Sequence, residues 1–152
     1  MATTIASAPL VVKITESCTL NGVQQGGTYT KTISGINEIS KRIVTATTTL
    51  TTVAAFAAEV AAGTYIIANV KYIRLTNLGS QVVTVQINSS AATEAASFLL
   101  AAGQSFVLFD VDDAFGAHDS SIGALVADAD ISAIQLDTDA NTSDVEVFIA
   151  SS

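Results

Sequence analysis

The stretch between Lys71 and Asp110 constrains the fold more than any other part of the chain. It reads KYIRLTNLGSQVVTVQIN and, after a short polar segment, SFLLAAGQSFVLFD. β-Branched and aromatic residues favour strands, and the Asn-Leu-Gly-Ser and Ala-Ala-Gly-Gln segments are turn signals. The pattern predicts two hairpins, one joining residues 64–76 to 81–87 and one joining 98–100 to 105–109.

Shorter alternating segments recur on both sides of this stretch. The whole set of turn signals and alternations predicts eight or nine short strands, which is typical of an all-β fold. The Ala-rich segment 54–62 favours either a short helix or a strand with a loop. We therefore expect an antiparallel β-sandwich, jelly-roll-like, with at most one short helix. The further strands are predicted at residues 10–20, 28–33, 41–53, 131–136 and 145–149, and the row Val83, Val85 and Ile87 is predicted to face the core.

The length of 152 residues suits one domain with a substantial core. Residues 1–9 are small and polar and end at Pro9, so we interpret them as an extended N-terminal arm, followed by a single sandwich domain over 10–152. The first ten residues contain no Lys or Arg, which a secretory signal requires. The longest apolar run, residues 53–62, is shorter than the about 20 residues that span a bilayer. We expect synthesis in the cytoplasm and no membrane partner.

Charge is divided sharply along the chain. All six basic residues precede residue 75, and ten carboxylates but no basic residue follow from Asp110 onward. The net charge is therefore +2 before Asp110 and −10 from it, which gives the total of −8. Such a chain is repelled by phosphates, so we expect no nucleic-acid partner.

The inventory of chemically reactive residues argues against an enzyme. His118 is the single histidine, and its neighbours Asp119, Ser120 and Ser121 are too close in sequence to converge on it as a triad. The Gly103-Gln-Ser105 segment lacks the second glycine of a nucleophile elbow. We predict no catalytic residues and no cofactor.

Metal binding has weak support. One cysteine and one histidine cannot complete a structural zinc site. Asp137-Thr-Asp139-Ala-Asn141 begins like a calcium loop, but Thr142 replaces its glycine and Phe148 its final glutamate. A different calcium site built on Asp110, Asp112 and Asp113 is an alternative to solvated carboxylates, which we favour. No metal ligands are predicted.

Two further residue types bear on binding. Cys18 lies in VVKITESCTL, where alternation places it on one face with Val12 and Ile14, so we predict a buried thiol. Tyr29, Tyr65 and Tyr72 would form a sugar-stacking surface if the fold gathered them. Because the chain has no Trp, ordinary packing is the better interpretation of these tyrosines.

The segments VKYIRLTNLGSQVVTVQI, FLLAAGQSFVLFD, ISAIQLDT and DVEVFIAS resemble small β-sandwich virion proteins of tailed bacteriophages, over about residues 64–150. Members serve as capsid cement or decoration proteins, or as modules of fibres and tails. The resemblance implies a non-enzymatic subunit of the virion, often a homotrimer, that binds the major capsid protein or other virion proteins at symmetric positions. The acidic segment after Asp110 is not part of this pattern.

Composition agrees with a subunit that buries surface against neighbours. Only 13% of residues are charged, and long charged side chains are depleted from interface cores. Our leading hypothesis is a capsid cement or decoration protein that acts through protein–protein contacts. The alternative is a fibre, tail or adhesin-type module that recognises surface glycans.

Overall fold

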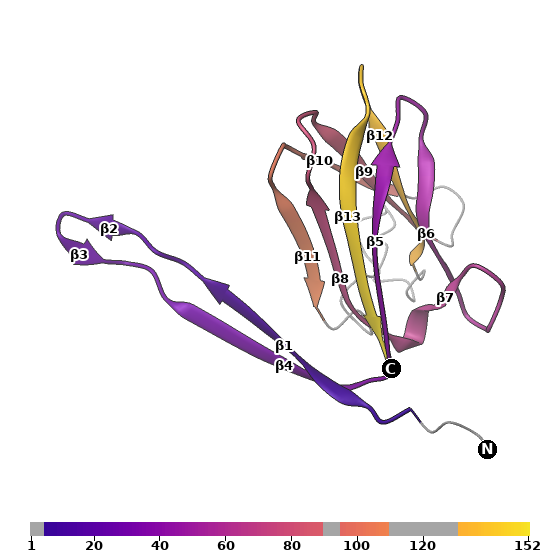
Figure 1. The fold of residues 1–152 in the computed structure, drawn as a ribbon, viewed down its shortest axis with the longest axis horizontal. Helices are drawn as coiled ribbons and strands as arrows, with labels where there is room; N and C mark the ends of the chain where they lie inside the picture. Colours follow the sequence, from indigo (N-terminus) through magenta and orange to yellow (C-terminus); the bar gives the residue numbers. More distant parts are fainter. Residues whose placement is uncertain (1–4, 90–94, 110–130) are drawn as a thin grey trace, which may run out of the picture.

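The computed structural model describes residues 5–89, 95–109 and 131–152, and it is an all-β sandwich, antiparallel in every described strand pair but one, with a long protruding arm (Figure 1). The predicted fold class is therefore confirmed. One sheet has four strands in the order β11-β8-β13-β5, and the other has five in the order β10-β9-β12-β6-β7. The four-stranded sheet comprises β5 (Glu38–Ala46), β8 (Val70–Asn77), β11 (Ser105–Phe109) and β13 (Ser143–Ser151). The five-stranded sheet comprises β6 (Thr51–Ala57), β7 (Tyr65–Ile66), β9 (Val83–Ser89), β10 (Ala95–Leu100) and β12 (Ile131–Thr138).

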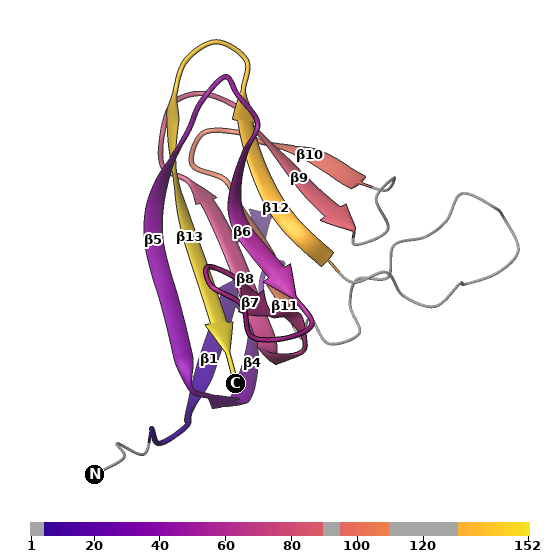
Figure 2. The ribbon, with the colours of Figure 1, turned by 90° about the vertical axis from the view of Figure 1, so that its right-hand side faces the viewer.

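Several links between successive strands cross from one sheet to the other. The links β5–β6, β8–β9, β10–β11 and β12–β13 all do so, and they gather at one end of the sandwich (Figure 2). Each of these four pairs is therefore stacked face to face across the core instead of sharing an edge.

The two predicted hairpins are consequently wrong as pairings, although their strands exist. β8 pairs with β11 and β13, whereas β9 pairs with β10 and β12. The physical reason is the apolar row on each strand: Ile73 and Leu75 of β8 and Val83 and Val85 of β9 are all fully buried. When β8 and β9 face each other across the core, both apolar rows are buried at once, as in the packing of one sheet on another.

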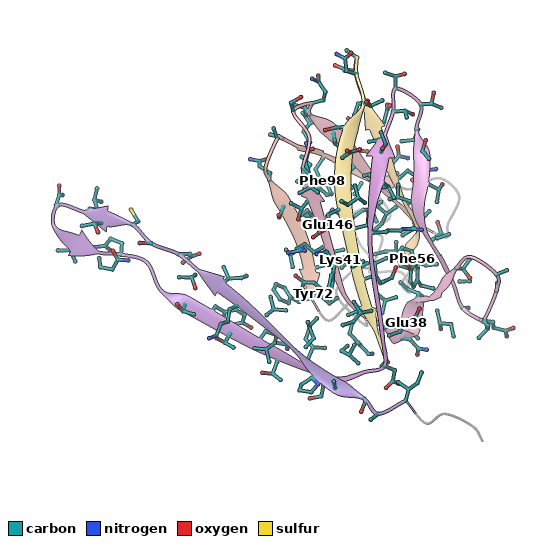
Figure 3. The ribbon with its side chains drawn as sticks, viewed as in Figure 1. Glu38, Lys41, Phe56, Tyr72, Phe98 and Glu146 are labelled. Atoms are coloured by element: carbon teal, nitrogen blue, oxygen red, sulfur yellow. The ribbon has the colours of Figure 1, made fainter. Side chains whose placement is uncertain are left out.

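The core lies between the two sheets and contains the predicted inner row of β9. Phe56 and Phe98 point into this space, whereas Tyr72 lies on the outer face of the four-stranded sheet (Figure 3). The core residues with the largest fully buried side chains are Ile73, Leu75, Ile134, Leu136, Ile149, Val70, Val83, Val85, Val145 and Val147.

A buried asparagine joins the links at the sheet-crossing end. Asn77 ends β8 and is completely shielded from solvent. Its Nδ2 donates to the carbonyls of Gln81 (2.7 Å) and Leu100 (2.9 Å), and its Oδ1 accepts from the Gly79 N–H (3.1 Å) and the Ser143 hydroxyl (2.9 Å). One side chain thus fixes the β8–β9 turn, the end of β10 and the start of β13.

Two expected elements differ from the structure. The single strand expected over 41–53 is two strands, β5 and β6, because residues 47–50 form a turn in which the Thr51 hydroxyl donates to the Thr49 carbonyl (2.8 Å). The helix considered for 54–62 is absent, since β6 continues to Ala57 and buries Phe56. The helical segment among the described residues is the single 3-10 turn η1 (Ile67–Asn69).

The arm is a β-hairpin that the sequence analysis placed within the sandwich. β1 (Ala8–Thr15) and β4 (Thr28–Ile36) form a separate two-stranded sheet, and β2 (Thr19–Leu20) and β3 (Val23–Gln24) form its tip. The tip turns at Asn21-Gly22, where both residues have positive φ, as a two-residue hairpin turn requires. The protruding arm thus extends through Ile36 instead of ending at Pro9. Its strands form no ladder with either sheet of the sandwich.

Candidate functional site: the arm and the sheet face it crosses

The hairpin arm has two distinct faces, set by the register of its strands. The pairs Leu10–Ile33, Val12–Lys31 and Ile14–Tyr29 lie on one face, which we call the underside. The pairs Val11–Thr32, Lys13–Thr30 and Thr15–Thr28 lie on the other face. The underside is therefore mostly apolar, whereas hydroxyl groups and one ammonium group dominate the opposite face.

The proximal half of the underside is seated on the outer face of the four-stranded sheet. Ile33 and Ile36 of the arm are buried together with Tyr72 and Ala150 of the sheet. At the root of the arm, the Asn37 N–H donates to the Ser151 carbonyl (2.9 Å). Leu10, Val12, Val107, Phe109 and Phe148 complete this second, smaller apolar cluster.

Aromatic rings form the floor of this seat. The Tyr72 ring meets Phe109 and Phe148 edge to face, with ring centroids 5.6 and 5.7 Å apart. Burial raises the pKa of the Tyr72 phenol above its usual value, and the nearby Arg74 guanidinium partly opposes this shift. The phenol therefore stays neutral under ordinary conditions and behaves as part of the apolar floor.

A groove of about 360 Å³ lies between the arm and the sheet, lined on the arm side by residues 10–14. On the sheet side, Arg74 lies over the Phe148 ring at 5.6 Å and pairs with Glu146, which also pairs with Lys41 (3.0 Å). Lys41 and Glu146 are labelled on this sheet in Figure 3. The groove has an apolar wall beside a small charged network, which suits a protein partner better than a small apolar ligand.

Apolar residues continue along the arm beyond its seat. Ile14 and Tyr29 lie on the underside but are 41% and 58% exposed, and Leu20 and Val23 at the tip are 61% and 58% exposed. A two-stranded hairpin is at best marginally stable alone in water. The distal arm therefore leaves uncovered the kind of surface that proteins normally bury against a partner.

The predicted burial of Cys18 is wrong. The thiol is exposed because β1 ends at Thr15 and residues 16–18 continue along the arm toward its tip, away from the core. The Glu16 N–H donates to the Gly27 carbonyl (2.8 Å), and the Gln25 N–H donates to the Cys18 carbonyl (2.8 Å), so the hairpin continues past the strand break. Alternation in the sequence predicted the strand but not its distance from the core.

The three tyrosines do not form a common surface. Tyr29 lies on the arm, and Tyr72 is buried in the arm seat. Tyr65 packs against the main core, where its hydroxyl donates to Ser40 Oγ (2.8 Å). The sugar-stacking cluster that the glycan-binding alternative requires is therefore not present.

The candidate metal and catalytic residues receive no support from the described ranges. No group of three potential metal ligands lies together within residues 5–89, 95–109 and 131–152. Asp137 Oδ1 instead accepts from the Thr138 N–H (2.8 Å). His118, Asp119, Ser120, Ser121 and the carboxylates at 110, 112 and 113 lie outside these ranges. No helix in the same ranges is long and apolar enough to cross a bilayer.

Comparison with known proteins adds little. No family model matches the chain, and no curated protein matches it. Among solved structures, the chain has a likeness to the Dit protein of phage SPP1, described as a paradigm of the hub adsorption apparatus in phages that infect Gram-positive bacteria. The TM-score is 0.26 at 10% identity, over 93% of this chain and 58% of that one. A TM-score this low does not define a shared fold.

Proposed function

We propose that this chain is a non-enzymatic structural subunit of a phage virion, which reinforces the head as a cement or decoration protein. One observation carries the proposal: the apolar underside of the arm extends beyond the sandwich that supports it. A lone molecule gains nothing from holding these side chains in water, whereas burial stabilises by about 25 cal/mol per Å² of apolar surface. An assembly of many copies supplies the missing cover.

The proposed partners are further copies of the chain and the major capsid protein or another virion protein. The resemblance of residues 64–150 to small virion sandwiches supports this choice of partners and a homotrimeric state. A protein with this function is made in the host cytoplasm and becomes part of the particle. No protein-bound cofactor is required, because the work is done by contacts between folded subunits.

Electron microscopy with antibodies against the purified chain tests the proposal on particles of the phage whose genome encodes it. We expect immunogold label at regular positions over the head. Heads that lack the chain should release their DNA at a lower temperature, and adding back the purified protein should restore the normal temperature. Absence of the chain from purified particles, or label confined to the tail, would overturn the cement assignment.

A further inference from the structure

We infer that the arm of each copy lies on the outer face of β5 of a second copy, in a head-to-tail contact between identical chains. The inference rests on the proposed function, because it specifies how copies of the structural subunit hold one another. In this contact, the uncovered distal underside of the arm, which includes Ile14 and Tyr29, packs against the exposed side chains of Ile39 and Ile43 on the neighbour's β5.

The path of the arm gives the direction of the contact. The arm is rooted beside the end of β13, where Asn37 bonds to Ser151. It then crosses Tyr72 of β8 and reaches Val107 and Phe109 of β11, which is an edge strand of the four-stranded sheet. Beyond β11 it leaves the sandwich, as Figure 1 shows. The uncovered part of the underside therefore lies past the β11 edge.

The opposite edge of the same sheet offers a matching uncovered surface. β5 pairs with β13 alone, and its register places Ile39 beside Ala150 and Ile43 beside Glu146, on the outer face. Ile39 and Ile43 are 56% and 62% exposed, although they lie on the same face as the arm seat. The seat covers β8 and β11, whereas on β5 Ile43 is open and Ile39 lines a groove with residues 6–10 of its own arm.

The overhanging arm and the exposed outer face of β5 come together when two copies lie edge to edge. If the β5 edge of one copy follows the β11 edge of the next, the four-stranded sheets form one continuous outer face. The arm that overhangs β11 then lies across the neighbour's β5. The contact joins two different patches, so it is heterologous, and repeating it by rotation closes a ring. It also shields two sheet edges that would otherwise be open to unwanted pairing.

Charge on the two surfaces is low. Residues 8–36 carry Lys13, Lys31 and Glu16, a net charge of +1. On the outer face of β5, Lys41 lies between Ile39 and Ile43 and pairs with Glu146 (3.0 Å). The apolar side chains therefore carry the contact, and the positions of the two sheet edges, not net charge, select an arm-on-β5 geometry.

A mixing experiment distinguishes the two geometries. In the full chain with Cys18→Ser, one preparation carries Tyr29→Cys and a second carries Ile43→Cys. A short bismaleimide should join the two preparations into a covalent dimer when they are mixed and allowed to exchange, and should join neither preparation to itself. Efficient joining of the Tyr29→Cys preparation to itself would overturn the inference in favour of an arm-to-arm contact.

A second experiment measures association of the purified chain by sedimentation. Ile43→Lys and Tyr29→Lys should each weaken self-association roughly tenfold or more, because each places a charge in an apolar contact. Leu99→Lys is the matched control, since Leu99 is 69% exposed on β10 of the other sheet. Equal effects of all three changes, or none from the first two, would overturn the inference.

Failure of this inference is separable from failure of the proposed function. Chains that label phage heads but show no cross-link between the two preparations would overturn the arm-on-β5 contact and leave the cement assignment standing. A cross-linked ring that is absent from phage particles would support the contact and overturn the assignment.

Discussion

Asn77 is the residue on which the sheet-crossing end depends. Its amide makes four hydrogen bonds to groups from three separate links, and the Asn77 side chain itself is fully shielded from water. Removing one partner from buried polar groups costs more than the bond itself contributes, because the group left behind stays desolvated.

We predict that Asn77→Ala lowers the free energy of unfolding by about 3 kcal/mol, the cost of leaving buried donors and acceptors unpaired. Urea denaturation followed by circular dichroism measures this change. The control is Thr76→Ala, which removes an exposed hydroxyl pair with Ser105 (2.8 Å) and should cost roughly 0.5 kcal/mol. Similar losses from both variants would contradict the role assigned to Asn77.

Gly79 is required by close packing in the same corner. A Cβ at this position would lie 2.1 Å from Ser143 Oγ and 3.0 Å from the Asp144 nitrogen. Gly79→Ala must therefore displace the Ser143 hydroxyl from Asn77, and we expect a loss of about 2 kcal/mol in unfolding free energy. Gly27→Ala, which meets nothing within 4 Å, should change stability by less than about 0.5 kcal/mol in the same urea titration.

Tyr72 makes stability depend on pH in the alkaline range. Burial raises the pKa of its phenol in the folded state above the unfolded value of 10.0. Its contribution is therefore fully present below that value and is lost as pH rises through the folded pKa, because the unfolded state ionises first. Above the unfolded value, wild type should lose stability faster than Tyr72→Phe. Parallel pH profiles of the two urea midpoints would show that burial of the phenol has no such effect.

At the scale of elements, the arm is tied to the sandwich by side-chain packing and few backbone bonds. Its strands pair only with each other, and the seat depends on a small cluster around Ile33, Ile36 and Tyr72. Elements held in this way open locally without global unfolding. The arm is therefore expected to detach from the sheet while both sheets remain intact.

We predict that Ile33→Ala accelerates amide hydrogen exchange in β1 and β4 by roughly thirtyfold, which corresponds to about 2 kcal/mol for truncating a buried Ile. Amides of β12 and β13 should be unaffected in the same exchange measurement. Val11→Ala, on the exposed face of β1, is the control and should change exchange neither in the arm strands nor in β12 and β13. Equal acceleration in β13 would mean that arm and sandwich open as one unit.

At the scale of the whole molecule, the topology joins distant parts of the sequence. β5 pairs with β13, so Ala46 lies opposite Ser143, and every sheet-crossing link brings the chain to the other layer. Long loops must close before such contacts form, and folding is correspondingly slow, in milliseconds to seconds for comparable β-sandwiches.

Pro9 is the single proline of the chain and lies in the arm. We therefore predict that the sandwich refolds without a proline-limited phase of tens of seconds. Stopped-flow circular dichroism on wild type and Pro9→Ala measures this. A phase of that duration in the wild type would come from Pro9 in the arm, and it should be absent from the variant. A slow phase that persists in Pro9→Ala would require another rate-limiting step.

Much of the fold could be predicted from the sequence because strand periodicity is local. The row of Val83, Val85 and Ile87 faces the core as expected, and the chain turns between β8 and β9 where the Asn-Leu-Gly-Ser segment indicates. The pairing of strands was not predictable in the same way, since an alternating row is buried equally well by an edge neighbour or by the opposite sheet. The Asn-Leu-Gly-Ser segment that begins at Asn77 indicated a turn locally. The four hydrogen-bond partners of Asn77 depend on tertiary contacts, so they could not be predicted.

The candidate surface was harder to predict. The exposed apolar residues of the arm, such as Ile14 and Tyr29, have the same alternation as core residues, so a sequence pattern assigns them to the core. The burial expected for Cys18 was wrong for this reason. A signal was present in the tip, where short strands and several glycines surround the turn, but nothing local shows that the hairpin stands apart from the sandwich.

The position of β13 has a consequence for synthesis of the protein. β13 is the last strand along the chain, yet it lies between β5 and β8 in the four-stranded sheet. This sheet therefore cannot close on the ribosome until residues 143–151 have emerged. A chain terminated before Ser143 would leave β5 and β8 without their shared partner, and the arm would have no finished face on which to sit. Translation through this strand is thus a condition for any copy to fold its outer face.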